Sequence, residues 1–189
     1  MKKFLFIITA FVAFTAFTTD NLWTNDDPHS QLGFTVTHLG ISDVSGTFND
    51  FDVTVRSTKP DFSDASFELT AKTASIDTRV EARDNHLRSA DFFNAEKYPT
   101  LTFKSNDIKK VSENKYKLSG DLTMNNITKP VTMDLTYKGS VENPMSKKQT
   151  VGFQITGTIK RSNFIIGNSF PEAVISDVVR IKADGEFTK

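Results

Sequence analysis

The segment 77–104 holds the side chains with the clearest chemical potential, because it places basic groups beside aromatic and carboxylate groups. Residues three and four apart share one face of a helix, and this spacing groups three cations: Arg79, Arg83 and His86. A forked guanidinium suits a phosphate, so these side chains could bind the anionic or carbonyl head of a ligand. The alternative is a solvated helix with surface ion pairs, which contribute only about 0–1 kcal/mol each. The residues alone leave both interpretations open.

A short helix from about Arg79 to Arg88 is predicted to position these cations. Thr78 and Glu81 have the S/T-x-x-E spacing of a capping box, in which each side chain accepts a hydrogen bond from a free backbone N–H of the first turn. After the helix, Tyr98-Pro99 returns the chain to extended geometry, because proline disfavours the helical conformation in the residue before it.

The other side chains of this helix predict how it packs. Val80 and Leu87 form an apolar stripe that we expect to face the strands. Asp84 and Arg88 have the i,i+4 spacing of an ion pair on the far side. We therefore expect the helix to lie across or beside one end of a β-structure, with its basic side chains next to the apolar stripe.

Around this helix, apolar and polar residues alternate with a period of two, which predicts about eight strands in a single domain. Short turns between such strands are typical of an antiparallel sandwich or a closed barrel. Asp26-Asp27-Pro28 predicts a turn before the first long strand, which begins at Ser30. Asn125-Asn126 predicts a hairpin, because asparagine tolerates the left-handed backbone that such turns require.

Small residues interrupt the apolar faces of these strands, and two explanations are open. Eight strands are about the number that can enclose one small ligand, so small inward residues could leave a cavity. A barrel filled by its own side chains also combines small residues with bulky neighbours. The residues concerned are Ala71, Gly120, Gly157, Ala183 and Gly185.

The chain has three histidines, His29, His38 and His86, and none of the usual nucleophile, phosphate-loop or zinc-protease motifs. His38 shares parity with Phe34 and Val36, so it should point to the apolar face, either as a hydrogen-bonded core residue or as a contact for a ligand's head. His38 and His86 could act as general base and acid in an enzyme, but no spacing supplies a nucleophile. No two histidines have metal-ligand spacing. We therefore predict no catalytic residue, no metal ligand and no cofactor.

The start of the chain predicts export. Lys2 and Lys3 precede an apolar run from Phe4 to Phe14, which is the layout of a secretory signal peptide and is too short to span a bilayer comfortably. We expect a cleaved leader over residues 1–19 and an exported, periplasmic domain over residues 20–189. No later segment is long and apolar enough for a membrane span.

The composition narrows the possible partners further. Across 189 residues there are 23 Lys and Arg against 23 Asp and Glu, and there is no cysteine. Without cysteine there is neither a disulfide framework nor a lipidated cysteine. Removal of the leader's two lysines leaves a mildly acidic chain, which argues against general affinity for nucleic acid.

At the level of motifs, the chain resembles the YceI-like family of exported, lipocalin-like proteins that bind polyisoprenoids. The resemblance covers nearly all of the chain after the leader. The matching pieces are Asp27-Pro28-His29-Ser30, Phe34-Thr35-Val36, His38-Leu39-Gly40-Ile41, Gly46-Thr47-Phe48, Arg83-Asp84-Asn85-His86-Leu87-Arg88-Ser89, Asp91-Phe92-Phe93, Tyr98-Pro99, Gly120-Asp121-Leu122-Thr123-Met124, Thr128-Lys129-Pro130-Val131 and Ile175-Ser176-Asp177. The chain departs from the pattern after Arg161, where Asn163-Phe164-Ile165 stands in place of an aspartate, phenylalanine and glycine.

The resemblance implies an all-β fold: an extended eight-stranded antiparallel lipocalin-like barrel with one short helix, often dimeric, with a long isoprenoid chain in an apolar tunnel. It also implies no catalytic activity. Our prediction is a periplasmic carrier of a long-chain isoprenoid or similar amphiphile. The alternatives are a ligand-free barrel acting as a stress-related interaction module and a histidine-dependent hydrolase of an amphiphile.

Two sets of residues are predicted to bind the ligand. The tail set comprises the inward residues Phe34, Val36, Phe67, Leu69, Ala71, Leu122, Met133, Leu135, Phe153, Ile155 and Gly157. The head set comprises the polar residues His38, Arg79, Arg83 and His86.

Overall fold

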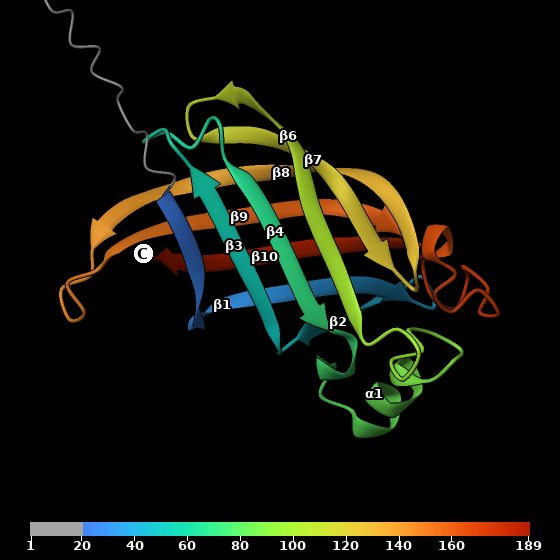
Figure 1. Cartoon of the computed structure of the whole chain (residues 1–189). Helices are drawn as coiled ribbons and strands as arrows, with labels where there is room; N and C mark the ends of the chain where they lie inside the picture. Colours follow the sequence, from blue (N-terminus) through green and yellow to red (C-terminus); the bar gives the residue numbers. More distant parts are fainter. Residues whose placement is uncertain (1–20) are drawn as a thin grey trace, which may run out of the picture.

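The structure is a computed structural model that describes residues 21–189, and these residues form an antiparallel sheet closed into a barrel (Figure 1). The predicted leader lies outside the described residues. The sheet contains β1 (Asn21–His38), β2 (Ser42–Phe48), β3 (Phe51–Ser57), β4 (Ser66–Lys72), β5 (Ile76–Asp77), β6 (Thr100–Ser112), β7 (Lys115–Met124), β8 (Ile127–Glu142), β9 (Gln149–Lys160) and β10 (Val178–Thr188). The helical elements are η1 (Thr73–Ser75), α1 (Glu81–Arg88) and η2 (Arg161–Phe164).

These strands occupy eight positions around the barrel, so the predicted eight-stranded fold is confirmed. Two positions are each shared by two strands: β3 and β2 pair with successive parts of β1, and β4 and β5 pair with β3 and β2 in turn. The remaining positions follow in the order β6, β7, β8, β9 and β10, and β10 pairs with β1 to close the barrel. The alternating pattern predicts one extended piece over residues 48–55 and another over residues 66–76, whereas the structure interrupts the first at 49–50 and the second at η1.

The first strand differs from the prediction, because the expected turn at Asp26-Asp27-Pro28 is absent. β1 runs through this segment, and its pairing with β10 shifts register between Asn25 and Ser30. Pro28 has no N–H to contribute to a ladder, so the extra residues bulge out of the sheet without ending the strand.

The hairpin prediction at Asn125-Asn126 is confirmed. Both residues have left-handed backbones, with φ of 50° and 59°, and they join β7 to β8. The alternation within β4 is also confirmed, because Phe67 and Ala71 are buried while Glu68 is exposed. The period-two pattern therefore separates the inner from the outer face of the barrel.

One end of the barrel is filled by its own aromatic side chains. Phe62, in the connection from β3 to β4, lies with its ring centroid 5.9 Å from Trp23, 5.0 Å from Tyr137 and 5.0 Å from Phe153. Trp23, Phe62 and Phe153 belong to one buried cluster, and Tyr137 packs against it. A second cluster occupies the opposite end, where α1 and η2 lie (Figure 1).

The N-terminus of α1 is built differently from the predicted capping box. Its N-cap is Val80, which makes no side-chain cap hydrogen bond. Arg79 has a left-handed backbone with φ of 66°, and this turn separates Thr78 from the helix. The backbone N–H and hydroxyl of Thr78 instead donate to Oδ1 of Asp84, at 2.8 and 2.5 Å. Asp84 therefore anchors the helix to the preceding chain from within its first turn.

The predicted ion pair between Asp84 and Arg88 is also wrong. Asp84 is buried and accepts from Thr78, whereas the Arg88 guanidinium donates to the carbonyls of Ala74 and Ile76, both at 2.8 Å. Both side chains thus bind the segment before α1. A helix of two turns gains more from these anchoring bonds than from a surface ion pair.

Half of the expected apolar stripe on α1 faces the barrel. Leu87 packs against the second buried cluster, but Val80 is 46 % exposed. Figure 1 shows α1 beside one end of the barrel, which is the predicted position.

Candidate ligand-binding site

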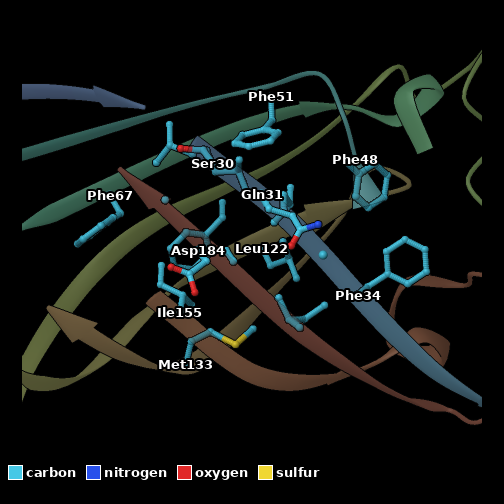
Figure 2. Close-up of a pocket in the computed structure, with 18 of the residues that line it drawn as sticks. Ser30, Gln31, Phe34, Phe48, Phe51, Phe67, Leu122, Met133, Ile155 and Asp184 are labelled. Atoms are coloured by element: carbon cyan, nitrogen blue, oxygen red, sulfur yellow. The ribbon is translucent and has the colours of Figure 1, made fainter. Parts of the chain in front are cut away.

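The barrel encloses an apolar cavity of about 140 Å³, here called the inner chamber (Figure 2). Its wall is built from inward side chains of the strands, because residues of one parity in each strand face the interior. Seven residues of the predicted tail set line it: Phe34, Phe67, Leu69, Leu122, Met133, Phe153 and Ile155. Lining residues that the sequence analysis did not select include Phe48, Phe51, Val53, Leu101, Phe103, Leu118, Ile181 and Phe187. They share the inward parity, so the alternation alone could have identified them.

A second cavity of about 360 Å³, here called the outer chamber, lies among the barrel end, α1 and the loop 165–175. The two chambers adjoin, because five residues line both of them: Phe34, Phe48, Met124, Ile159 and Ile181. Together they form a passage from the middle of the barrel to its helical end. The volume of the outer chamber falls within the range of about 300–1,000 Å³ that is usual for small-molecule sites.

The inner chamber has Ser30, Gln31 and Asp184 among its lining residues, whereas the basic groups of the passage lie in the outer chamber. His38, Thr78, Arg83, His86 and Arg161 line it, and no aspartate or glutamate of the described chain does. The chamber is therefore a mainly apolar space with a positive end. Three residues of the predicted head set meet there.

Arg83 is held in position by Thr78. Its Nε donates to Oγ1 of Thr78 at 2.7 Å, and its Nη2 donates to the carbonyl of Thr78 at 2.9 Å. Within residues 21–189, Nη1 of Arg83 makes no hydrogen bond. Since Thr78 is itself bound to Asp84, the guanidinium is presented on a rigid support with a donor free for a ligand.

The two histidines of the chamber have different surroundings. His86 is exposed, and its Nε2 lies 3.1 Å from Oδ2 of Asp91, while its ring meets Phe92 edge-on at 5.0 Å. His38 is half-buried at the end of β1, on the same wall as Val36, and its backbone pairs with Ile175. His38 thus faces the interior as its parity predicts.

Arg161 is a residue of this site that the sequence analysis missed. It is 6 % exposed, and all five of its guanidinium N–H groups donate to backbone carbonyls between residues 166 and 176. The loop that walls the outer chamber is therefore wrapped around one side chain. Burial raises the pKa of the neighbouring Asp177 carboxyl, but the hydrogen bond from Ser162 and the charge of Arg161 outweigh it and lower the pKa. A lone arginine between a strand and an irregular loop that holds Gly167 and Pro171 is the signal that could have identified it.

Four residues of the predicted sets line neither chamber. Ala71 and Leu135 are fully buried in the two packed clusters. A Cβ at Gly157 would lie 2.1 Å from Sδ of Met133, so that space is already filled. Arg79 is exposed and lies before the first residue of α1. Because its backbone is left-handed, its side chain does not belong to the helix face that carries Arg83.

The small residues on the strands divide between the two explanations offered above. A Cβ at Gly120 would lie 2.7 Å from the Phe103 ring, so Gly120, like Gly157, makes room for a bulky neighbour. A Cβ at Gly185 would lie 2.8 Å from Oγ of Ser30, so packing accounts for this glycine as well, although it lies in the wall of the inner chamber. Ala183 also lines the inner chamber, and a cavity accounts for its small side chain.

A closed antiparallel barrel with an apolar passage and polar groups at one end defines the class of small lipocalin-like barrels. The YceI-like domain matches residues 23–187, and the chain belongs to this family. UPF0312 protein SA2479 of Staphylococcus aureus strain N315 is 41% identical over 165 residues, which are 87% of this chain and 92% of that protein.

Solved structures share the same fold. Burkholderia cenocepacia BcnA superposes with a TM-score of 0.77 at 25% identity, over 86% of this chain and 98% of that one. A polyisoprenoid binding domain from Saccharophagus degradans, implicated in plant cell wall breakdown, superposes with a TM-score of 0.66 at 14% identity, over 88% and 97% of the two chains. None of the helices in residues 21–189 has the length and apolar character needed to cross a membrane.

Proposed function

We propose that this protein is an exported carrier that holds a long-chain isoprenoid or similar amphiphile in its barrel. The tail lies in the inner chamber and the head stops in the outer chamber. The observation that carries the proposal is that an apolar inner chamber adjoins an outer chamber lined by Arg83 and Arg161, with no carboxylate among the lining residues of the outer chamber in the described chain. The solved polyisoprenoid binding domain supports this ligand class through its shared fold.

Apolar burial supplies enough affinity for such a ligand. Burial of apolar surface contributes about 25 cal/mol per Å², so a chain of several isoprene units needs no specific polar contact to bind. The polar end of the passage would then select and orient the head, which is the usual division of roles in small-molecule sites.

The polar groups of the outer chamber support binding better than hydrolysis. Among its lining residues in the described chain, Thr78 is the one with a hydroxyl, and that hydroxyl donates to Asp84 while it accepts from Arg83. A nucleophile needs a base within hydrogen-bond reach, and neither His38 nor His86 bonds Thr78. The geometry therefore favours a binding protein.

Native mass spectrometry of the protein isolated from the exported fraction of its own cells tests the proposal. We expect a chain that begins close to Asp20, with a lipid-sized mass attached, and the same spectrum reports whether the protein is a dimer. A folded chain with no bound mass would support the ligand-free interaction module instead. An intact N-terminus at Met1 in the cytoplasm would contradict export.

The head contact can be tested with a matched pair of arginine variants. Arg83→Gln removes a cation that lines the outer chamber, whereas Arg79→Gln removes one that does not. One charge-assisted hydrogen bond is worth about 1.5–3 kcal/mol, and 1.4 kcal/mol is one decade of affinity. We expect Arg83→Gln to weaken binding of a polyprenyl phosphate by about tenfold and Arg79→Gln to leave it nearly unchanged, as measured by displacement of a fluorescent lipid.

An uncharged polyprenol of equal length is the second control in this experiment. Arg83→Gln should leave its affinity nearly unchanged, because no anionic head is present. Equal losses for the charged and uncharged ligands would show that Arg83 acts through the shape of the chamber. If neither ligand loses affinity, Arg83 does not contact the ligand and serves only as the hydrogen-bond partner of Thr78.

A further inference from the structure

A cluster of metal-ligating side chains lies on the barrel surface, where β1 meets β10. It consists of Asp26, His29 and Glu186, and one ligand atom of each lies within 4.8 Å of the other two. Nδ1 of His29 and Oδ2 of Asp26 are 2.9 Å apart. These residues line neither chamber, so the proposed lipid function makes no use of them.

The irregular pairing of the two strands brings this cluster together. The register shifts between residues 25 and 30, so that residues 26–29 have only Glu186 opposite them. Because the extra residues bulge out of the ladder, Asp26 and His29 both come beside a carboxylate from the far end of the sequence. Two donor groups of the first strand and one from the last strand thereby converge at the seam that closes the barrel.

The electrostatics of the cluster favour a cation. Within residues 21–189, neither Asp26 nor Glu186 forms a salt bridge with a lysine or arginine. An adjoining surface groove, which His29 also lines, adds four aspartates: Asp27, Asp50, Asp52 and Asp184. A groove lined by charges of one sign raises the local concentration of the opposite ion.

We propose that Asp26, His29 and Glu186 bind a divalent transition-metal ion such as Zn²⁺. An imidazole nitrogen with carboxylate oxygens suits Zn²⁺ and its neighbours, whereas Ca²⁺ and Mg²⁺ take oxygen ligands. Bonds of about 2.0–2.2 Å place two ligands of one ion up to about 4 Å apart, so rotations of these surface side chains by about 1 Å complete the site. Three protein ligands leave a position for water.

This site differs from the three-histidine site that the sequence analysis rejects. It needs one histidine, and its third ligand, Glu186, could not be associated with the other two from sequence spacing. An ion held there ties the first strand of the barrel to the last. Since the ligands converge only in the folded chain, the ion binds the folded state and stabilises it.

Calorimetric titration of the untagged, chelator-treated full chain with Zn²⁺ tests the proposal. We expect saturation at one ion per chain, a rise in melting temperature with Zn²⁺, and much weaker binding of Ca²⁺. Loss of a partner outside the coordination shell already costs a metal site about 10–100-fold in affinity. His29→Gln and Asp26→Asn should therefore each weaken Zn²⁺ binding by at least about tenfold.

Asp27→Asn is the matched control, because it makes the same charge change at the adjacent residue, which does not belong to the cluster. We expect it to retain the affinity of the unmodified protein. Circular dichroism confirms that each variant is folded. Absence of saturable Zn²⁺ binding, or equal weakening by Asp26→Asn and Asp27→Asn, would overturn the proposal. The cluster would then be a surface ion pair between His29 and Asp26 among other carboxylates.

Discussion

Replacing Arg161 with methionine is expected to lower the free energy of unfolding by about 3 kcal/mol or more, since each buried carbonyl left without a donor costs about 1–3 kcal/mol. The guanidinium donates to five carbonyls: those of Ile166, Gly167, Phe170, Ile175 and Ser176. Methionine fills part of the space but donates nothing. Five carbonyls would sum to about 5–15 kcal/mol, but some of them will regain water as the loop relaxes, so we expect a loss below that sum.

Urea denaturation measures this change, and hydrogen exchange locates it. We expect faster exchange in the loop 165–176 and an outer chamber that binds lipid more weakly, because the loop is one of its walls. Arg180→Met is the control, since Arg180 is half-exposed and its one salt bridge, to Asp43, lies at the surface. Its stability should scarcely change. Equal stabilities for the two variants would mean that the loop holds its shape without Arg161.

The features that follow from local rules could be predicted from the sequence. The period of two assigns Phe67 to the inside and Glu68 to the outside, because successive side chains of a strand point to opposite faces. Asn125-Asn126 marks a hairpin, because the turn needs two left-handed residues. Such rules act over a few residues, and they locate strands and turns but say little about interruptions. The break between β2 and β3 falls at Asn49-Asp50, where turn-forming residues interrupt the strand without changing the alternation around them.

The polar features depend on contacts between distant residues, and the sequence reasoning failed at several of them. Thr78 has the spacing of a helix cap, yet it binds Asp84, because a left-handed Arg79 intervenes. Arg161 bonds backbone carbonyls, and these have no side-chain signature. Inward parity alone also does not separate a cavity wall from a packed core. Gly157 and Ala183 have the same parity pattern, but only Ala183 lines a chamber, because Met133 fills the space at Gly157.

Ala183→Phe is therefore expected to abolish most lipid binding while the barrel stays folded. A cavity of about 150 Å³ can hold one benzene, so a phenyl ring grown from the wall fills most of the inner chamber's 140 Å³. A tail that must share this space loses its apolar contacts at about 25 cal/mol per Å². We expect occupancy in native mass spectra to fall by at least about tenfold, with circular dichroism unchanged.

Two further variants separate blocking of the chamber from other effects of the new ring. Thr156→Phe adds the same ring on the outward face of β9, beside Lys182, and should leave lipid occupancy unchanged. Gly157→Leu forces a side chain against Met133, and such overpacking costs about 1–3 kcal/mol, so it should lower stability before it affects occupancy. If Ala183→Phe loses stability as Gly157→Leu does, the inner chamber is part of a packed core. If Ala183→Phe folds and still carries lipid, the tail does not enter the inner chamber, and the outer chamber alone must hold the ligand.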